Sequence, residues 1–160
     1  VMPIFIVIRE FQEEDAPRVQ KIALKCFDSN IRKDKKLYLA KHFVKSYFKL
    51  KNIEARLDNQ YELYVLIKNE IVGFVEIQDG NTITNIFVDP PYQKQGYGTQ
   101  LLKHAIMRCQ ALDPKLDHVS LDAETHAIRF YEHCGFTSLS RSKTVMGVEM
   151  TMMEIKLKNN

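Results

Sequence analysis

The segment 83–102 constrains the fold more than any other part of the chain. It predicts a β-strand, a proline stop, a loop with two glycines and the start of an amphipathic helix, in that order. Gly96 and Gly98 allow the backbone to approach a ligand closely, and the free N–H groups and positive end of the following helix would point at that ligand. The segment therefore predicts an anion site, with a phosphate as the expected anion.

The spacing of the glycines excludes two common phosphate loops. Gly96 and Gly98 lie two apart with no Lys-Ser/Thr after them, so the Walker pattern is absent. A dinucleotide-binding fingerprint needs a small residue where Leu101 stands. The remaining pattern, Q-x-x-G-x-G from Gln93 to Gly98, resembles the acetyl-coenzyme A pyrophosphate loop of the GNAT N-acetyltransferase superfamily. The preceding Phe87–Pro90 resembles that family's strand ending in V-x-P. The alternative is an ordinary strand-turn-helix whose glycines serve only the turn.

A second motif covers Ala127–Phe136, a predicted short helix that ends at Gly135 in the left-handed conformation. The pattern F-Y-x-x-x-G-F, which begins with Phe130 and Tyr131, resembles the A-x-x-F-Y-x-x-x-G-F segment of the same family. Its order and separation from the glycine loop also match. On this resemblance Tyr131 has a functional role. The alternative is that Tyr131 packs as Phe130 does and that its hydroxyl finds a buried partner.

Hydrophobic periodicity predicts the other elements of one domain spanning residues 1–160. The predicted strands are Pro3–Arg9, Tyr61–Lys68, Ile71–Gln78, Thr82–Val88, His118–Leu121, Val145–Val148 and Thr151–Leu157. A helix capped by Asp15 is expected to bury Val19, Ile22, Ala23 and Cys26, a second helix Leu37, Ala40, Val44 and Phe48, and the helix after the loop Leu101, Leu102, Ala105, Ile106, Cys109 and Leu112. The predicted class is α+β in three layers: a GNAT-like mixed, mostly antiparallel sheet with a central parallel strand pair and helices on both faces.

The resemblance implies where acetyl-coenzyme A (acetyl-CoA) would bind. It would lie in a V-shaped gap between the strands Thr82–Val88 and His118–Leu121, which splay to hold it. Its pantetheine would pair with the backbone of Phe87 and Val88, and its pyrophosphate with the N–H groups from Gln95 to Thr99. The residues implied to bind this cofactor are Phe87, Val88, Gln93, Lys94, Gln95, Gly96, Tyr97, Gly98, Thr99, Thr125, Ala127 and Phe130.

The implied reaction transfers an acetyl group to a primary amine of a small molecule or a protein, by direct attack in a ternary complex. The amine must first lose a proton, because a lysine-like amine has a pKa of about 10.4. The backbone N–H of Val88 is expected to stabilise the thioester oxygen. Tyr131, protonated at neutral pH, is expected to protonate the leaving thiolate.

The general base is less clear from the residues. Many relatives carry a glutamate where this chain has Asn85, whose amide cannot act as a base. Glu76 is the best substitute, through a water chain, because strand alternation puts it on one face with Phe74. The alternative is a solvated strand carboxylate. His126 and His133 are further candidates, with helix-surface histidines as the alternative, and an amine of low pKa would need no base.

Composition favours a soluble, globular chain in a reducing cytosol. The chain has 45% apolar and 27% charged residues and no apolar run long enough to cross a membrane. The apolar start, residues 2–8, is expected to be a strand and not a signal peptide. Three cysteines, Cys26, Cys109 and Cys134, lie far apart on apolar helix faces, which predicts buried free thiols. No Cys/His spacing predicts a metal site.

The sequence is compatible with two competing functions, and it does not identify the acceptor amine. Asn85 motivates a catalytically weak acyl-CoA-binding or sensor module. The basic segment Arg32–Lys51 motivates a nucleic-acid binder, although a solvated face, or a surface that attracts acidic substrates, is the simpler interpretation at a net charge of +3. The methionines of Arg141–Met153 either line an apolar acceptor pocket or fill the core. The terminal strands could pair across a homodimer.

Overall fold

A computed structural model describes residues 5–30 and 38–158 of the protein. Its strands form one sheet in the order β1-β2-β3-β4-β5-β7-β6, in which only β4 and β5 run parallel. The strands are β1 (Val7–Glu10), β2 (Tyr61–Lys68), β3 (Glu70–Gln78), β4 (Thr82–Val88), β5 (His118–Glu124), β6 (Thr137–Val145) and β7 (Val148–Lys156). The predicted α+β class, with a mostly antiparallel sheet and one central parallel pair, is confirmed.

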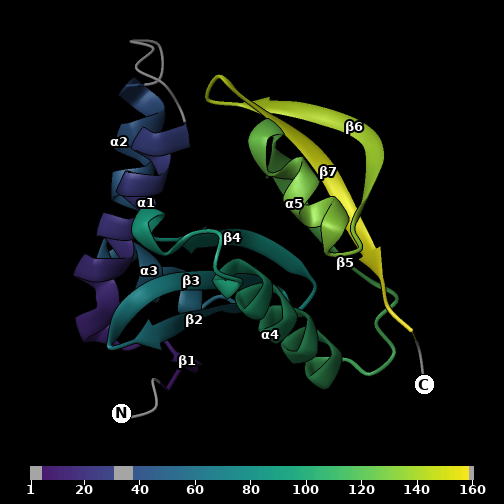
Figure 1. The fold of residues 1–160 in the computed structure, drawn as a ribbon, viewed down its shortest axis with the longest axis horizontal. Coiled ribbons are helices and arrows are strands. Elements are labelled where there is room, and N and C mark those ends of the chain that lie inside the picture. Colours follow the sequence, from purple (N-terminus) through teal and green to yellow (C-terminus); the bar gives the residue numbers. More distant parts are fainter. Residues whose placement is uncertain (1–4, 31–37, 159–160) are drawn as a thin grey trace.

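Helices cover both faces of the sheet (Figure 1). They are α1 (Ala16–Asn30), α2 (Tyr38–Tyr47), α3 (Leu50–Leu57), α4 (Tyr97–Leu112) and α5 (Ile128–His133), with short 3-10 turns at Glu13–Asp15, Pro90–Tyr92 and Thr125–Ala127. Two separate cores result. One joins α1–α3 to one face of the sheet, and the other joins α4 and α5 to the opposite face.

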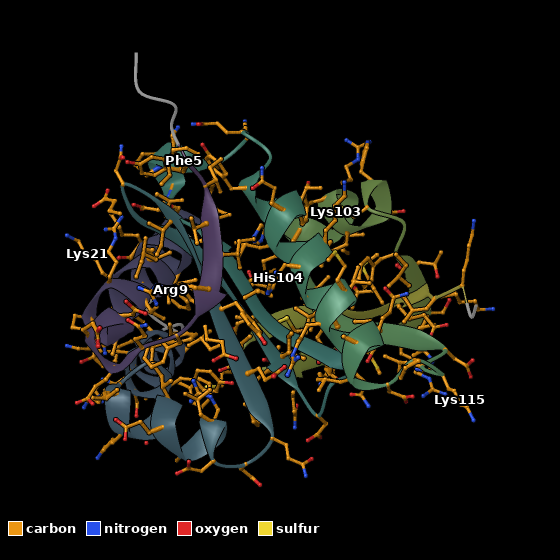
Figure 2. All side chains as sticks on the ribbon, turned by 90° about the horizontal axis from the view of Figure 1, so that it is seen from below. Phe5, Arg9, Lys21, Lys103, His104 and Lys115 are labelled. Carbon is orange, nitrogen blue, oxygen red and sulfur yellow. The ribbon has the colours of Figure 1, made fainter. Side chains whose placement is uncertain are left out.

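Strand β3 contributes to both cores because its side chains alternate between the faces. Val75 and Ile77 pack in the core under α4, whereas Phe74 packs in the core under α1–α3. Glu76 shares the face of Phe74, as predicted, and its partners lie on the α2–α3 side. Figure 2 shows His104 on the side of α4 that faces the sheet, where its ring lies 4.6 Å from that of Tyr64.

The first helix begins directly after Asp15, as predicted, but the side chain of Asp15 caps the turn before α1 and not α1 itself. Asp15 lies in the turn before α1 and is buried. Its carboxylate accepts hydrogen bonds from Arg9, at 2.7 and 3.0 Å, and from the backbone N–H of Gln12 at 2.8 Å. Asp15 therefore fastens β1 to the start of the helical layer. The predicted stripe of α1 is buried as expected, with Val19 and Ile22 fully enclosed.

Two further differences concern elements with weak sequence signals. Helix α3 was not predicted; the chain becomes extended at Lys49, between α2 and α3. The predicted strand Val145–Val148 is wrong, because Met146 and Gly147 have positive φ and form the two-residue turn of the β6–β7 hairpin. Strand β6 was missed since every one of its residues is exposed, so no alternation of polar and apolar residues marks it.

Helix α4 provides a test of the core packing. Leu102 is 1% exposed and Met107 on the same helix is 66% exposed. We expect Leu102→Ala to lower the free energy of unfolding by about 2–5 kcal/mol, because it leaves a cavity. Met107→Ala, the control, should stay within about 0.5 kcal/mol. Urea unfolding followed by circular dichroism measures both, and equal losses would contradict the described packing.

Candidate active site

The parallel strands β4 and β5 separate soon after they begin. They pair at only two positions, Thr82 with Ser120 and Ile83 with Leu121. Beyond Ile83, β4 remains paired with β3 but has no strand on its other side. In Figure 1, β5, β6 and β7 turn away from the part of the sheet formed by β1–β4. One edge of β4 is therefore free in the middle of the sheet.

A β-bulge coincides with this separation. The register of β4 against β3 steps from Ile83 to Asn85, so Thr84 is left between them without a partner. A bulge bends the strand and increases its twist. It also turns the side chains of Thr84 and Asn85 toward the same carboxylate, that of Glu76. The bulge therefore helps to direct β4 away from β5.

The end of β4 is fastened to α1 by charge and hydrogen bonds. Asp89 is 2% exposed and pairs with Arg18 at 2.7 Å and with Lys25 at 3.1 Å. The carbonyl of Val88 accepts hydrogen bonds from Cys26 Sγ at 3.1 Å and from Gln93 Nε2 at 2.9 Å. These contacts hold the free edge of β4 in a defined position.

The gap between the strands is the mouth of a cavity of about 690 Å³. Most of the predicted cofactor residues line it, together with Tyr131: Phe87, Val88, Gln93, Lys94, Gly96, Tyr97, Gly98, Thr99, Ala127 and Phe130. Two predicted residues are not in its lining. Gln95 is exposed with its amide 3.4 Å from the carbonyl of Pro91, and Thr125 starts the 3-10 turn after β5.

The glycine loop presents a helix end to this cavity. Gly96 adopts the left-handed conformation (φ 88°) immediately before α4, which favours glycine. The first N–H groups of α4, from Tyr97 to Thr99, have no partner within the helix. A Cβ atom at Gly98 would lie 3.2 Å from the ring of Phe130. The two sequence motifs therefore meet in space at Gly98.

Tyr131 lies beside that contact. It is 7% exposed, and its ring packs against Phe130 and Phe136 with centroids 5.1 and 5.8 Å apart. Its hydroxyl forms no hydrogen bond to any side chain or backbone group that the structure describes, and the residue lines the large cavity. Burial, aided by the charge of Glu124, raises the pKa of Tyr131. The hydroxyl is thus a protonated donor available to a ligand.

Glu76 is sealed away from the cavity. It is 1% exposed, so the alternative of a solvated carboxylate is wrong. It accepts hydrogen bonds from Tyr47 Oη at 2.6 Å, Thr84 Oγ1 at 2.7 Å, Arg56 Nε at 2.9 Å and Asn85 Nδ2 at 3.0 Å. A carboxylate at position 85 would face this buried charge with a like charge. The structure therefore explains why an amide occupies that position.

Arg56 joins this cluster to the helices. Its guanidinium carbon lies 3.5 Å from the centroid of the Tyr47 ring, and its Nη1 donates to the carbonyls of Tyr47 and Asn52 at 2.7 and 3.2 Å. Sequence reasoning missed Arg56 because the helix that carries it, α3, was not predicted. Tyr47 was missed because it lies far from both motifs along the chain.

A smaller cavity of about 240 Å³ adjoins the large one. The residues that line both cavities are Cys26, Thr84, Asn85, Phe87, Glu124 and Met150. Met146 also lines the smaller cavity, whereas Met153 is buried in the core; Met153 is thus core filler, and an acceptor pocket lined by Met146 stays a prediction. The two cavities therefore lie side by side and share this part of their walls, here called the shared middle.

Glu124, at the end of β5, is the carboxylate in that shared middle. Its side chain is 28% exposed, and Oε2 lies 3.3 Å from His126 Nδ1. Burial raises the pKa of Glu124, and the neighbouring His126 partly opposes this shift. Sequence analysis missed Glu124; the available signal was its place at the carboxyl end of a parallel strand, where α/β sheets commonly bind ligands.

Cys26 and the two histidine candidates are also placed by the structure. Burial and the charges of Asp89 and Glu124 raise the pKa of Cys26 to about 12, so its thiol stays protonated and is a poor nucleophile. His126 lines the large cavity. His133 is on the surface, with Nδ1 2.7 Å from the carbonyl oxygen of Arg129. The prediction of free cysteines is confirmed, with Cys26 and Cys109 buried and Cys134 half-buried.

Comparison with known proteins bears directly on this site. A family model described as the acetyltransferase (GNAT) domain matches residues 12–157. The chain belongs to the GNAT acetyltransferase family. No curated protein matches this GNAT chain, so the family model and the solved structures provide the comparison.

Solved structures share the fold along nearly the whole chain. A GCN5-related N-acetyltransferase from Rhodopseudomonas palustris has a TM-score of 0.81 at 18% identity, with 98% of this chain and 99% of that chain covered. PaiA N-acetyltransferase from Thermoplasma acidophilum, in complex with coenzyme A, has 0.76 at 15% identity (96% and 100% covered). YncA from Salmonella typhimurium, with acetyl-CoA, has 0.68 at 18% identity (98% and 96% covered).

The rest of the described surface of this GNAT domain adds little to the site. Of the basic segment, residues 31–37 lie outside the described residues, and Lys41 pairs with Asp28 at 2.8 Å. Across residues 5–30 and 38–158, no group of three or more His, Cys, Asp or Glu side chains could hold a metal ion. In the same ranges, no helix is long and apolar enough to cross a membrane.

The buried cluster around Glu76 can be tested by removing its cation. Arg56→Met leaves a buried carboxylate without its ionic partner, and we expect the free energy of unfolding to fall by about 3–5 kcal/mol. The matched control is Arg108→Met, which breaks a more exposed pair with Glu62 (38% and 27% exposed) and should cost less than about 1 kcal/mol. Urea unfolding of the two variants measures both losses in the free energy of unfolding. Similar losses for the two variants would contradict a structural role for Glu76.

Proposed function

We propose that this GNAT domain transfers an acetyl group from acetyl-CoA to a primary amine by direct attack within a ternary complex. The observation that carries the proposal is the cavity of about 690 Å³ that brings the start of α4, the free edge of β4 and Tyr131 together. The coenzyme A and acetyl-CoA in the structures of PaiA and YncA support this choice of cofactor.

The backbone supplies most of the contacts in this proposal. The pyrophosphate binds the N–H groups from Gly96 to Thr99, which line the cavity and where the helix end favours negative charge. The N–H of Asp89 donates to the carbonyl of Val72 on β3 at 2.8 Å, so strand alternation turns the N–H of Val88 toward the gap. There it is available to the pantetheine or to the thioester oxygen. Alternation turns the backbone of Phe87 toward β3, while its side chain lines the cavity.

Glu124 is the general base in this proposal, and Glu76 is a positioning residue. Four donors already occupy the carboxylate of Glu76, which lines neither cavity. Glu124 lines both cavities, and burial raises its pKa. A carboxyl group with a raised pKa is a better proton acceptor at neutral pH than an ordinary one.

The proposed acetyl transfer proceeds in a sequence of proton and bond changes. The acceptor ammonium gives one proton to Glu124, and the neutral amine attacks the carbonyl carbon of the thioester. A C–N bond forms, the C–S bond breaks, and its electron pair leaves on sulfur. Tyr131 protonates the thiolate and regains a proton from the attacking nitrogen through water. The amide and the free thiol are released, and Glu124 passes its proton to solvent.

A covalent route and a non-catalytic role each lack support from the site. The protonated thiol of Cys26 donates to Val88 and does not offer a nucleophile. Asn85 suggested a catalytically weak acyl-CoA-binding module, but its amide hydrogen-bonds Glu76 at 3.0 Å. The missing carboxylate at position 85 therefore has a structural reason, and Glu124 provides one from the opposite strand.

Binding of acetyl-CoA is the first test. Gly98→Glu should weaken binding more than tenfold, because a side chain there meets Phe130 and its charge repels the pyrophosphate. Met107→Glu, on an exposed position of the same helix, adds the same charge and should bind normally. Isothermal titration calorimetry measures both. The proposal fails if the unaltered protein does not bind acetyl-CoA.

The base can be tested through its proton. With the unaltered protein, kcat/KM should rise with pH through the raised pKa of Glu124, because only the carboxylate accepts a proton. Among the described residues, His126 in the following turn, Cys26 on α1 and Tyr131 on α5 interact electrostatically with Glu124. Glu124→Gln should lower the rate by roughly 10²–10⁴-fold and remove this limb of the pH profile.

The matched control for that variant is Glu54→Gln, an exposed substitution on α3, which should leave the rate and its pH profile unchanged. Thiol release from acetyl-CoA, followed over a pH series with a fixed amine, provides the measurement. A Glu124→Gln variant with full activity and an unchanged profile would exclude Glu124 as the base.

A further inference from the structure

The smaller cavity differs in character from the large one. Its walls come from α1, α2, β4 and the β6–β7 hairpin, and most of them are apolar or aromatic. Phe43, Val44 and Phe48 contribute from α2 and its end, and Val148 from β7. Its volume of about 240 Å³ is below the range of drug-sized pockets, so it fits one short apolar group.

The smaller cavity also has very few charged side chains in its walls. Among the described residues that line it, Glu124 is the one charged side chain. The polar groups of Tyr47, Thr84 and Asn85 also line it, but all three donate to Glu76. Among the described residues, a ligand in the cavity therefore finds one carboxylate and few free polar partners.

We propose that the acceptor is a small primary amine with a single apolar substituent, an alkylamine or arylalkylamine, whose ammonium meets Glu124 while the substituent fills the smaller cavity. This inference rests on the proposed acetyl transfer. Because Glu124 lines both cavities, an amine held by it lies at the entrance to the space assigned to the thioester. One side chain would thus bind the ammonium and then accept its proton.

The same walls disfavour other common amines. A diamine would bury a second ammonium among Phe43, Val44 and Phe48, and an amino acid of similar length would bury a carboxylate there. Either charge would lose part of its hydration there without gaining a partner among the described residues, which is unfavourable. The aliphatic chain itself gains from leaving water in every case. The cavity therefore selects among primary amines by the group at the end of the acceptor opposite the reacting amine.

A matched series of three acceptors isolates that far end: hexylamine, 1,6-diaminohexane and 6-aminohexanoate. They share the chain and the amine and differ in carrying a methyl, an ammonium or a carboxylate at the other end. We expect kcat/KM for hexylamine to exceed that for the other two by at least about tenfold, equivalent to about 1.4 kcal/mol. Thiol release and the mass of the acetylated product provide the readout.

A variant of the cavity wall provides a second test. Phe43 is half-exposed and lines only the smaller cavity. Phe43→Asp should raise KM for hexylamine with little change in kcat, and it should improve 1,6-diaminohexane relative to hexylamine. Leu39→Asp, on an exposed position of the same helix that lines neither cavity, is the matched control and should leave the preference unchanged.

Calorimetry with acetyl-CoA on the same samples separates the possible failures. If acetyl-CoA binds and the diamine or the amino acid is the better acceptor, the apolar acceptor is excluded while acetyl transfer stands. If acetyl-CoA binds and none of the three amines is acetylated, the inference is again excluded and another class of acceptor is required. If acetyl-CoA does not bind, the proposed function and this inference fall together.

Discussion

Glu76 carries a carboxylate inside the sheet, where a charge without partners would be strongly destabilising. Its donors come from different parts of the fold: Tyr47 from α2, Arg56 from α3, and Thr84 and Asn85 from β4. Satisfying this one group therefore brings two helices and the bulged strand to the same point. Because β4 is bulged there, it leaves β5, and the separation of these strands creates the site. The geometry of the site thus depends on a residue that does not line it.

Different parts of the site offer different chemical groups, because they come from different elements of the fold. The backbone of β4 and the start of α4 offer N–H groups, which suit the amide and phosphate groups of a long cofactor. Glu124 at the shared middle and Tyr131 in the large cavity have pKa values raised by burial, and this suits proton transfer. Among the residues that the structure describes, the walls of the smaller cavity carry no charge beyond Glu124. In the proposed function, binding, chemistry and selectivity therefore fall to different groups.

The parts of the fold that were predicted correctly have strong local signals. The β2–β3 hairpin has buried apolar runs, and the segment from β4 through the glycine loop, like Phe130–Tyr131, has a distinctive order of residue types. The parts that were missed have weak signals. Strand β6 is exposed along its whole length, and α3 follows α2 after a very short break. The spacing of apolar residues along the chain indicates which side chains are buried. It therefore does not reveal an exposed strand or a short break between two helices.

The sequence by itself determined the fold class, the glycine loop before α4 and the family, because these depend on residues close together in the chain. Only the tertiary structure decided the roles of the carboxylates. Glu76 and Glu124 are similar in sequence terms, each being an acid in a predicted or adjacent strand. Packing encloses Glu76 among four donors and leaves Glu124 beside two cavities. The surroundings of a carboxylate set its pKa and its access to a substrate, and those surroundings come from segments far apart in the chain.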